Sequence, residues 1–173
     1  WAENRTAFYF NQKINCMPAV GTVSIHGTRK EFAPDRSFGV LDWGRGRWTY
    51  ENRWYWASAS GTLPDGTRIG FNLGYGFSDR TPASENMLFY AGRAHKLGRV
   101  TFSFDSRDYL SPWRFTSDDE RLSLDFRPTL DRCGDTNLLV IRSTQHQCFG
   151  YYSGTVVLSA GSAITIDRLP GFA

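Results

Sequence analysis

Apolar and polar residues alternate along most of the chain with a period of two, which places successive side chains on opposite faces of a β-strand. Segment 67–75 shows this most clearly, because Ile69, Phe71 and Leu73 fall on one face. Convincing helical periodicity is absent. Such segments recur at near-regular spacing, which predicts roughly ten antiparallel strands in a barrel or sandwich. The fourteen strand-like segments from which these strands would come are residues 6–10, 20–25, 28–32, 38–43, 54–60, 67–75, 86–90, 93–97, 99–104, 113–116, 122–126, 137–147, 149–158 and 163–169.

Glycine marks the turns between these strands. His26-Gly27 and Ala91-Gly92 are two-residue hairpin turns, because glycine accepts the positive φ that such turns require. In the segment 63–66 a proline presets the turn and Gly66 closes it, so this hairpin has the strongest local signal. The expected irregular segments are a loop at 78–84 and short helical turns at 105–111 or 117–120.

Composition places the chain among ordinary globular domains. At 173 residues it is long enough to bury a core, and we expect a single β-barrel domain over 1–173. Aromatic residues make up 16% of the chain, so the apolar content is carried unusually heavily by rings. The net charge of +3 is small and its positive residues are scattered, which argues against nucleic acid as a partner.

The cysteines and the chain ends bear on location and completeness. Cys16, Cys133 and Cys148 are odd in number and widely spaced, which favours reduced thiols and a cytoplasmic location. No stretch approaches the length of a transmembrane helix. The chain begins at Trp1 and ends just after a strand-like run. We therefore expect that the chain is one half of a longer polypeptide.

Segment 42–48 and the run 54–56 that follows it hold four of the six tryptophans, together with one carboxylate and two guanidiniums. Indoles offer large apolar faces and stack with cations. The segment therefore suits a ligand pocket, although it also suits a packed corner of the core. Its candidate ligand-binding residues are Trp43, Arg45, Arg47, Trp48, Trp54 and Trp56.

Asp42 is the candidate catalytic residue. It lies between Leu41 and Trp43 near the end of a predicted strand, where partial desolvation would favour its protonated form and equip it for acid catalysis. The alternative is a structural ion pair with Arg45 or Arg47. The sequence leaves both possibilities open.

The polar face of segment 67–75 carries Gly70, Asn72 and Gly74. A strand face made of glycines leaves space for another group to approach the backbone. That group is either a ligand, for which Asn72 is a candidate contact, or an indole from Trp54 or Trp56. Tyr75, at the end of this segment, is a further candidate ligand-binding residue. Glu85-Asn86 and His95-Lys96 form a second polar cluster, and from it Asn86 is a candidate ligand-binding residue.

Other common chemistries lack support. The three histidines share no helical spacing with carboxylates, and His146 with Cys148 supplies too few ligands for zinc. Glycine-rich pieces such as 44–46 and 74–76 precede no helix, so they predict no phosphate site. We therefore expect no metal and no cofactor.

Several long motifs resemble one family. They are the runs 10–18, 38–46 and 69–77, followed by Glu85-Asn86 and 95–97. Together they resemble the proteins grouped as domain of unknown function 2804. Members are usually about twice as long as this chain, so the resemblance implies that the chain is a C-terminal half and that the missing N-terminal half is its partner.

That family is similar, more distantly, to lipocalin-like (calycin) two-domain proteins, which include carotenoid hydratases and tocopherol cyclases. The resemblance implies an all-β fold, either an antiparallel lipocalin-like barrel or a strongly curled β-sandwich. In those proteins a segment rich in aspartate and tryptophan lines a cavity, and Asp42 and Trp43 fall in the corresponding segment. Gly44-Arg45 stands where some of them carry a histidine.

Three functions follow as hypotheses. The first is binding of a hydrophobic small molecule, such as a lipid, isoprenoid or polyene, in an aromatic-lined cavity. The second is a hydratase, cyclase or isomerase that acts on such a molecule with Asp42 as the acid. The third is a structural or assembly module in which the aromatic segment is core.

Overall fold

The computed structural model describes residues 1, 3–79 and 83–173. These residues form strands, turns and irregular segments, so the predicted all-β antiparallel class is confirmed. No helix occurs among them, and hence none that could span a membrane. Two compact units make up the chain, Trp1–Lys96 and Leu97–Ala173.

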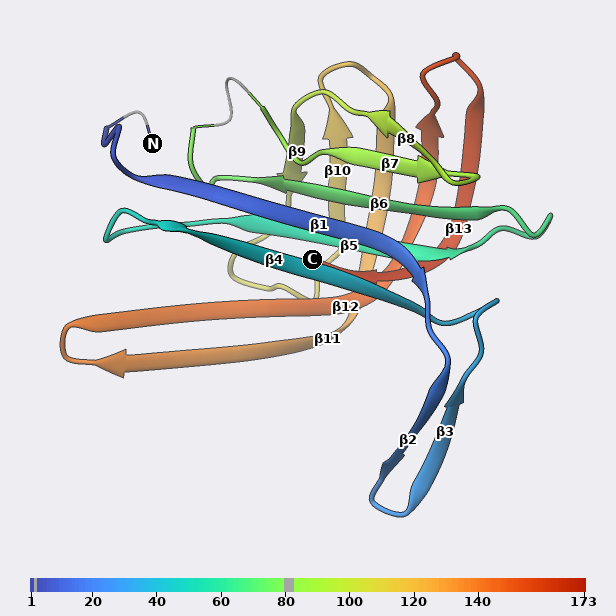
Figure 1. Ribbon diagram of the computed structural model, residues 1–173, viewed down its shortest axis with the longest axis horizontal. Helices are drawn as coiled ribbons and strands as arrows, with labels where there is room; N and C mark the ends of the chain where they lie inside the picture. The colour runs from blue at the N-terminus through green and yellow to red at the C-terminus, as the bar shows by residue number, and fades with distance from the viewer. Residues whose placement is uncertain (2, 80–82) are drawn as a thin grey trace. The chain divides into compact units, whose positions relative to one another are not determined.

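The described residues of the first unit form the eight strands β1 to β8, which are labelled in Figure 1. Strands β5 to β8 pair consecutively into an antiparallel meander, while β1 pairs with β4 and β2 pairs with β3. The strands are β1 (Phe8–Pro18), β2 (Gly21–Ile25), β3 (Thr28–Phe32), β4 (Phe38–Arg47), β5 (Tyr55–Thr62), β6 (Arg68–Tyr75), β7 (Met87–Tyr90) and β8 (Arg93–Lys96).

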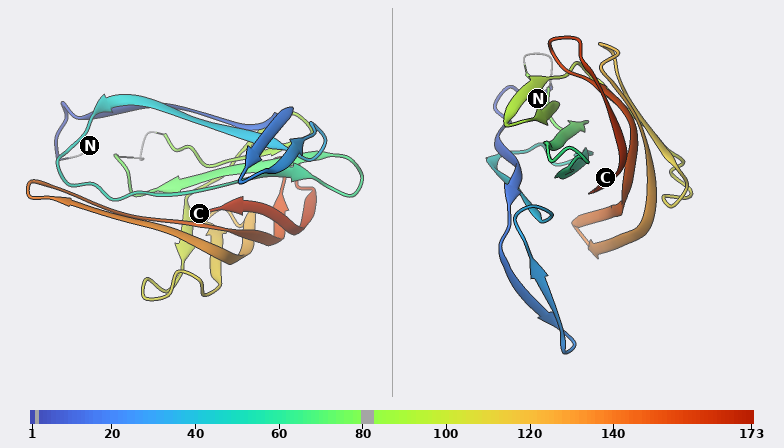
Figure 2. Two further views of the ribbon diagram at one scale, coloured as in Figure 1. Left: turned by 90° about the horizontal axis from the view of Figure 1, so that it is seen from below. Right: turned by 90° about the vertical axis from the view of Figure 1, so that its right-hand side faces the viewer.

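The β1–β4 ribbon forms a second layer beside β5 and β6 (Figure 2). Its contacts fall on the face of β6 that carries Gly70, Asn72 and Gly74. Asn15 of β1 donates to Ser58 Oγ and to the Phe71 carbonyl, and the Cys16 amide donates to Ser60 Oγ. Side chains of β1 therefore cover the glycine face of β6. The opposite face of β5 and β6 is core, with Ala57, Ala59, Ile69, Phe71 and Leu73 all buried.

The glycine turns of the first unit have the expected geometry. His26 and Gly27 both have positive φ, of 48° and 76°, as a two-residue hairpin turn requires. Ala91 and Gly92 repeat this pattern with 50° and 78°. At 63–66, Gly66 has a φ of 83° and donates its amide to the Leu63 carbonyl. Residues 80–82 of the expected loop 78–84 lie outside the described residues.

The second unit is a meander in which each strand pairs with the next, from β9 to β13. Its core is aromatic. Trp113 and Phe115 are buried on one face of β10. Phe126 of β11 stacks on Tyr152 of β12 with ring centroids 4.4 Å apart. The strands are β9 (Val100–Ser103), β10 (Trp113–Ser117), β11 (Leu122–Leu138), β12 (Ile141–Val157) and β13 (Ala163–Phe172).

The β11–β12 hairpin is longer than the sequence predicts. Separate strands were expected at 122–126, 137–147 and 149–158, whereas β11 and β12 each run for 17 residues without interruption. Pro128 breaks the alternation in the sequence, but a register shift between Pro128 and Leu130 accommodates it within the ladder. Segment 105–111, where a short helical turn is expected, holds two successive hydrogen-bonded turns, and segment 117–120 holds one; neither segment forms a helix.

Burial distinguishes the cysteines, all of which are free thiols. Cys148 is fully buried, and this burial, reinforced by the Asp131 carboxylate, raises the pKa of its thiol to about 12. Cys133 is exposed. Because the thiolate is the reactive form, we expect iodoacetamide to modify Cys133 in the folded protein and Cys148 only after unfolding. Peptide mapping by mass spectrometry checks this order, and equal rates for the two thiols in the native protein would contradict the burial of Cys148.

Candidate functional site

A cavity of about 450 Å³ lies within the first unit. Among the described residues, its lining combines six aromatic rings with four polar side chains, the composition typical of small-molecule sites. The rings belong to residues of β1, β5 and the segments that follow β4 and β6. The lining residues are Tyr9, Lys13, Asp42, Trp48, Asn52, Trp54, Tyr55, Trp56, Phe77 and Glu85.

The register of the β1–β4 ribbon decides which side chains reach this cavity. Alternate residues of β1 point the same way, and Tyr9 and Lys13 are two of them. Lys13 pairs directly with Asp42 across the ribbon, so the two side chains share a face. The ribbon thereby brings one ammonium and one carboxylate to the cavity wall.

Lys13 is the centre of the charged cluster. Its Nζ lies 2.7 Å from Asp42 Oδ1 and 3.8 Å from Glu85 Oε2. The same ammonium lies 4.1 Å from the centroid of the Trp56 ring, a cation–π contact. The side chains of Lys13, Glu85 and Asp42 are 11%, 17% and 34% exposed. The cluster is therefore largely desolvated, and Asp42 is its most accessible member.

Glu85 fills the space above Gly74. A Cβ at Gly74 would collide with Glu85 Oε1, so only glycine allows the carboxylate to approach the strand this closely. Asn11 of β1 donates to Glu85 Oε2 at 2.9 Å. The expectation that an indole or a ligand occupies the glycine face is therefore wrong at Gly74. The corresponding space at Gly70 is occupied by Cys16 Sγ.

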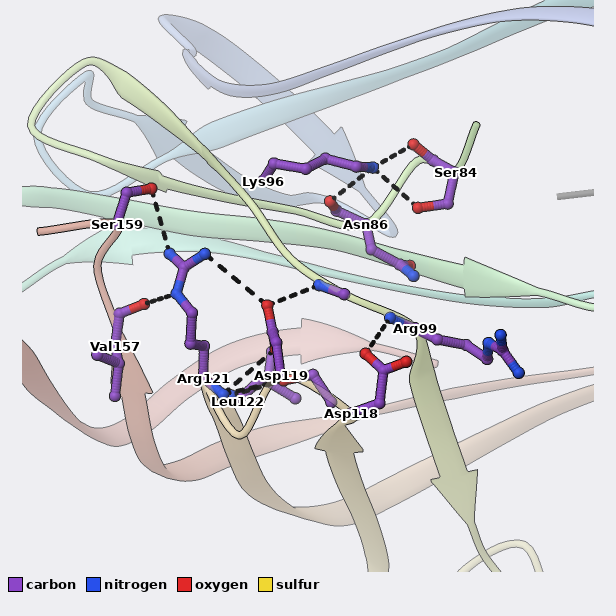
Figure 3. A network of polar contacts seen from close by, with 12 residues as sticks. Ser84, Asn86, Lys96, Arg99, Asp118, Asp119, Arg121, Leu122, Val157 and Ser159 are labelled. Atoms are coloured by element: carbon purple, nitrogen blue, oxygen red, sulfur yellow. Dashed lines mark hydrogen bonds and ion pairs between the residues drawn. The ribbon is translucent and has the colours of Figure 1, made fainter. Parts of the chain in front are cut away.

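Lys96 holds the segment on either side of Glu85 (Figure 3). Its Nζ donates to Ser84 Oγ at 2.8 Å, to the Asn86 carbonyl at 3.1 Å and to the Ser84 carbonyl. Asn86 in turn accepts from the Gly74 amide at 2.8 Å. The polar cluster 85–86 and 95–96 noted in the sequence thus positions the Glu85 carboxylate at the cavity.

We expect Lys96→Met to loosen this segment. The variant removes charge-assisted hydrogen bonds of an exposed side chain, so a loss of about 1 kcal/mol in the free energy of unfolding is expected. Chemical denaturation measures it, with Arg93→Met on the same strand as the control. The account of Lys96 is wrong if both variants unfold at the same denaturant concentration as the parent chain.

Phe77 organises the aromatic wall. Its ring meets Tyr9 edge to face at a centroid distance of 4.8 Å, and Trp54 and Trp48 lie at 6.1 and 6.3 Å. Trp1 adds a further edge-to-face contact at 5.0 Å. Such arrangements fix ring orientation, so the wall has a defined shape.

The structure brings some of the predicted site residues together and leaves others outside. Asp42, Trp48, Trp54 and Trp56 all line the cavity. Three other predicted residues, all on β4, do not line the cavity. Their partners in the ribbon are even-numbered residues of β1, which face away from the cavity. These three residues and their partners are Trp43 with Gln12, Arg45 with Phe10, and Arg47 with Phe8.

The remaining predicted residues lie behind the lining. Asn72 is buried, accepts from Trp56 Nε1 at 2.8 Å and donates to the Glu85 carbonyl at 3.1 Å. Tyr75 stacks on Tyr55 at 4.6 Å, and its burial together with the neighbouring Tyr55 raises the pKa of the phenol. Asn72, Tyr75 and Asn86 therefore orient lining groups.

Of the described lining residues, sequence reasoning missed Tyr9, Lys13, Asn52, Tyr55 and Phe77, and it noted Glu85 only as part of a polar cluster. A partial signal exists for Lys13, since the polar residues Lys13 and Asn15 alternate with the apolar residues Ile14 and Cys16. These residues lie beyond residue 10, where the predicted strand ends. No comparable pattern marks Phe77. In the described part of the chain, His, Cys, Asp and Glu side chains do not gather into any group of three or more that could hold a metal.

Comparison with known proteins gives one match. The family model described as Domain of unknown function (DUF2804) matches residues 1–173, which confirms the family resemblance. No curated protein matches the chain, and neither does any solved structure.

Proposed function

The chain belongs to the Domain of unknown function (DUF2804) family, and we propose that it binds a hydrophobic small molecule in the cavity of its first unit. The observation that carries this proposal is the wall of six rings around about 450 Å³ of space. A volume of this size falls within the range of small-molecule pockets. The ligand class is a lipid, isoprenoid or polyene, whose apolar body would displace water from the rings.

The charged cluster supports a ligand with one polar end. Lys13, Asp42 and Glu85 are confined to one part of an otherwise largely aromatic lining. A polar group of the ligand placed there would keep its hydrogen bonds, whereas one placed against the rings would lose them. The cluster would thus set the direction in which the ligand enters.

The enzymatic alternative is supported less well. It requires Asp42 to donate a proton, but Asp42 Oδ1 is paired with the Lys13 ammonium at 2.7 Å. The group that this hypothesis needs as its acid is therefore engaged in an ion pair.

Titration of the chain with decanol tests the proposal. Six of the ten lining residues are aromatic and three of these are tryptophans, so binding should change the intrinsic fluorescence. We expect a saturable change with one decanol molecule bound per chain. A linear, unsaturable response would contradict the proposal. Native mass spectrometry of the chain purified from its host would then show whether a protein partner is retained instead.

A further inference from the structure

The turn of the β11–β12 hairpin carries four consecutive exposed aliphatic side chains. They are Leu138, Leu139, Val140 and Ile141, whose exposed fractions range from 59% to 102%. Among the described strands, β10 pairs with β11 only as far as Phe126, and β13 pairs with β12 only as far as Phe149. The aliphatic tip, residues 138–141, therefore lies at the end of a two-stranded ribbon, which can be followed along β11 and β12 in Figure 1.

The conformation of the turn gives no reason for these residues. Leu139 has a φ of 52°, in a region that favours glycine and is unfavourable for leucine. The hairpin turns at 26–27 and 91–92 each have a glycine as their second residue, whereas 139–140 contains none. Contact with water is also unfavourable for a leucine side chain. An exposed apolar patch that is retained at such a cost marks a site of interaction with another surface.

The apolar part of the ribbon is short. Leu138 pairs with Ile141, and the next three pairs towards the base of the ribbon are polar. With a rise of about 3.3 Å per residue, the aliphatic tip is about 7 Å deep. Apolar faces that lie in a membrane interface enter the boundary between headgroups and acyl chains by about 5–10 Å. The depth of the tip therefore fits a lipid surface.

One cation lies directly behind the tip. Arg142 belongs to the first polar pair, and Asp135 lies two pairs farther from the turn. Among the described residues these two form an ion pair at 3.9 Å between exposed side chains, through Arg142 Nε. Such a contact engages the guanidinium weakly, and the planar fork of an arginine matches the geometry of a phosphate. An apolar tip backed by a guanidinium complements an anionic lipid surface.

A second copy of the chain fits the tip less well. A stable protein interface uses about 20–30 residues on each side, whereas the tip offers four side chains. Acyl chains are fluid and can surround a protruding turn without a preformed recess. We propose that the β11–β12 hairpin docks on an anionic lipid surface. Its aliphatic tip enters the boundary between headgroups and acyl chains, and Arg142 binds a headgroup phosphate.

Flotation of the chain with vesicles of phosphatidylcholine and phosphatidylglycerol tests this docking. Leu139→Gly is the decisive variant, because glycine suits the φ of this turn and the variant should melt no lower than the parent chain. We expect the parent to float with the vesicles and Leu139→Gly to partition about tenfold more weakly, since a leucine side chain is no longer buried in lipid. Leu110→Gly is the control, because Leu110 is an exposed residue of the second unit outside the hairpin.

Three results would overturn the proposal. The first is a parent chain that stays in the aqueous fraction at every lipid concentration. The second is equal partitioning of Leu139→Gly and Leu110→Gly. The third is self-association of the parent, measured by sedimentation velocity, that Leu139→Gly abolishes, because the tip would then contact a second copy.

Arg142→Gln tests the headgroup contact. We expect the affinity for the anionic vesicles to fall about fivefold, the effect of one cation near such a surface. Arg132→Gln is the matched control, because Arg132 lies five pairs farther from the turn. That separation of about 17 Å exceeds the Debye length of about 10 Å, so this variant should bind as the parent does. Equal affinities of the two variants would overturn the role of Arg142.

Discussion

Trp54→Ala is expected to weaken decanol binding about tenfold to hundredfold. Trp54 lines the cavity and meets the Phe77 ring. Losing an indole face that contacts the ligand costs roughly 1.5–3 kcal/mol by the buried-area rule, which corresponds to that change in Kd. The fluorescence of the remaining tryptophans, or calorimetry, measures the affinity.

Trp43→Ala provides a matched control. Trp43 is 47% exposed and Trp54 is 52% exposed, so the two substitutions remove similar amounts of accessible indole surface. Trp43 pairs with Gln12 on the outer face of the ribbon and touches Phe10. Its loss should change the affinity less than about twofold, since it makes no contact with the ligand. Equal losses in the two variants would place the ligand outside the cavity.

Gly70→Ala is expected to destabilise the first unit by about 1–3 kcal/mol, the usual cost of overpacking. A Cβ at Gly70 would lie 2.6 Å from the Ala59 carbonyl oxygen of the neighbouring strand and would collide with Cys16 Sγ. The carbonyl belongs to the β5 backbone and cannot rotate away. Either β5 and β6 separate locally or the β1–β4 ribbon moves outward. A lower melting temperature in calorimetry is the expected result.

Gly134→Ala is the corresponding control. Gly134 lies in β11, and a Cβ there would meet nothing within 4 Å. The substitution should therefore leave the melting temperature unchanged or raise it slightly, because alanine reduces the freedom of the unfolded chain. A similar loss in both variants would mean that the cost does not depend on the space around the glycine. The close approach of Ala59 and Cys16 to Gly70 would then not explain the loss.

The alternation of residues predicts the fold class well, because each strand face is decided locally. Ile69, Phe71 and Leu73 are fully buried on one face, and the turns at His26-Gly27 and Ala91-Gly92 form where glycine predicts them. The length of β11 was missed for a physical reason. Its outer half is exposed, so no alternation of burial is imposed on its sequence there.

The candidate site was predictable only in part. The tryptophan-rich segment does supply Trp48, Trp54 and Trp56 to the lining. Which face each residue of β4 occupies depends on its register with β1, and a shift of one position would exchange Asp42 for Trp43. The ion pair of Asp42 with Lys13 is a property of that register. The residues near Asp42 in the sequence instead suggested an ion pair with Arg45 or Arg47, but both arginines lie on the other face of the ribbon.

Glu85 illustrates a contact that no local pattern encodes. Its carboxylate accepts a hydrogen bond from Asn11, a residue 74 positions away in the chain. The same carboxylate lies against Gly74 of β6. The glycine face of β6 correctly signalled a close approach of another group. The identity of that group depends on packing between distant segments, which the sequence of β6 alone does not specify.

A crystal structure of the chain grown with decanol tests the central claim most directly. The account predicts one decanol molecule inside the first unit, with its chain against Trp54 and its hydroxyl toward Asp42. Decanol bound only elsewhere on the chain, with the cavity closed by Trp48 and Phe77, would contradict it.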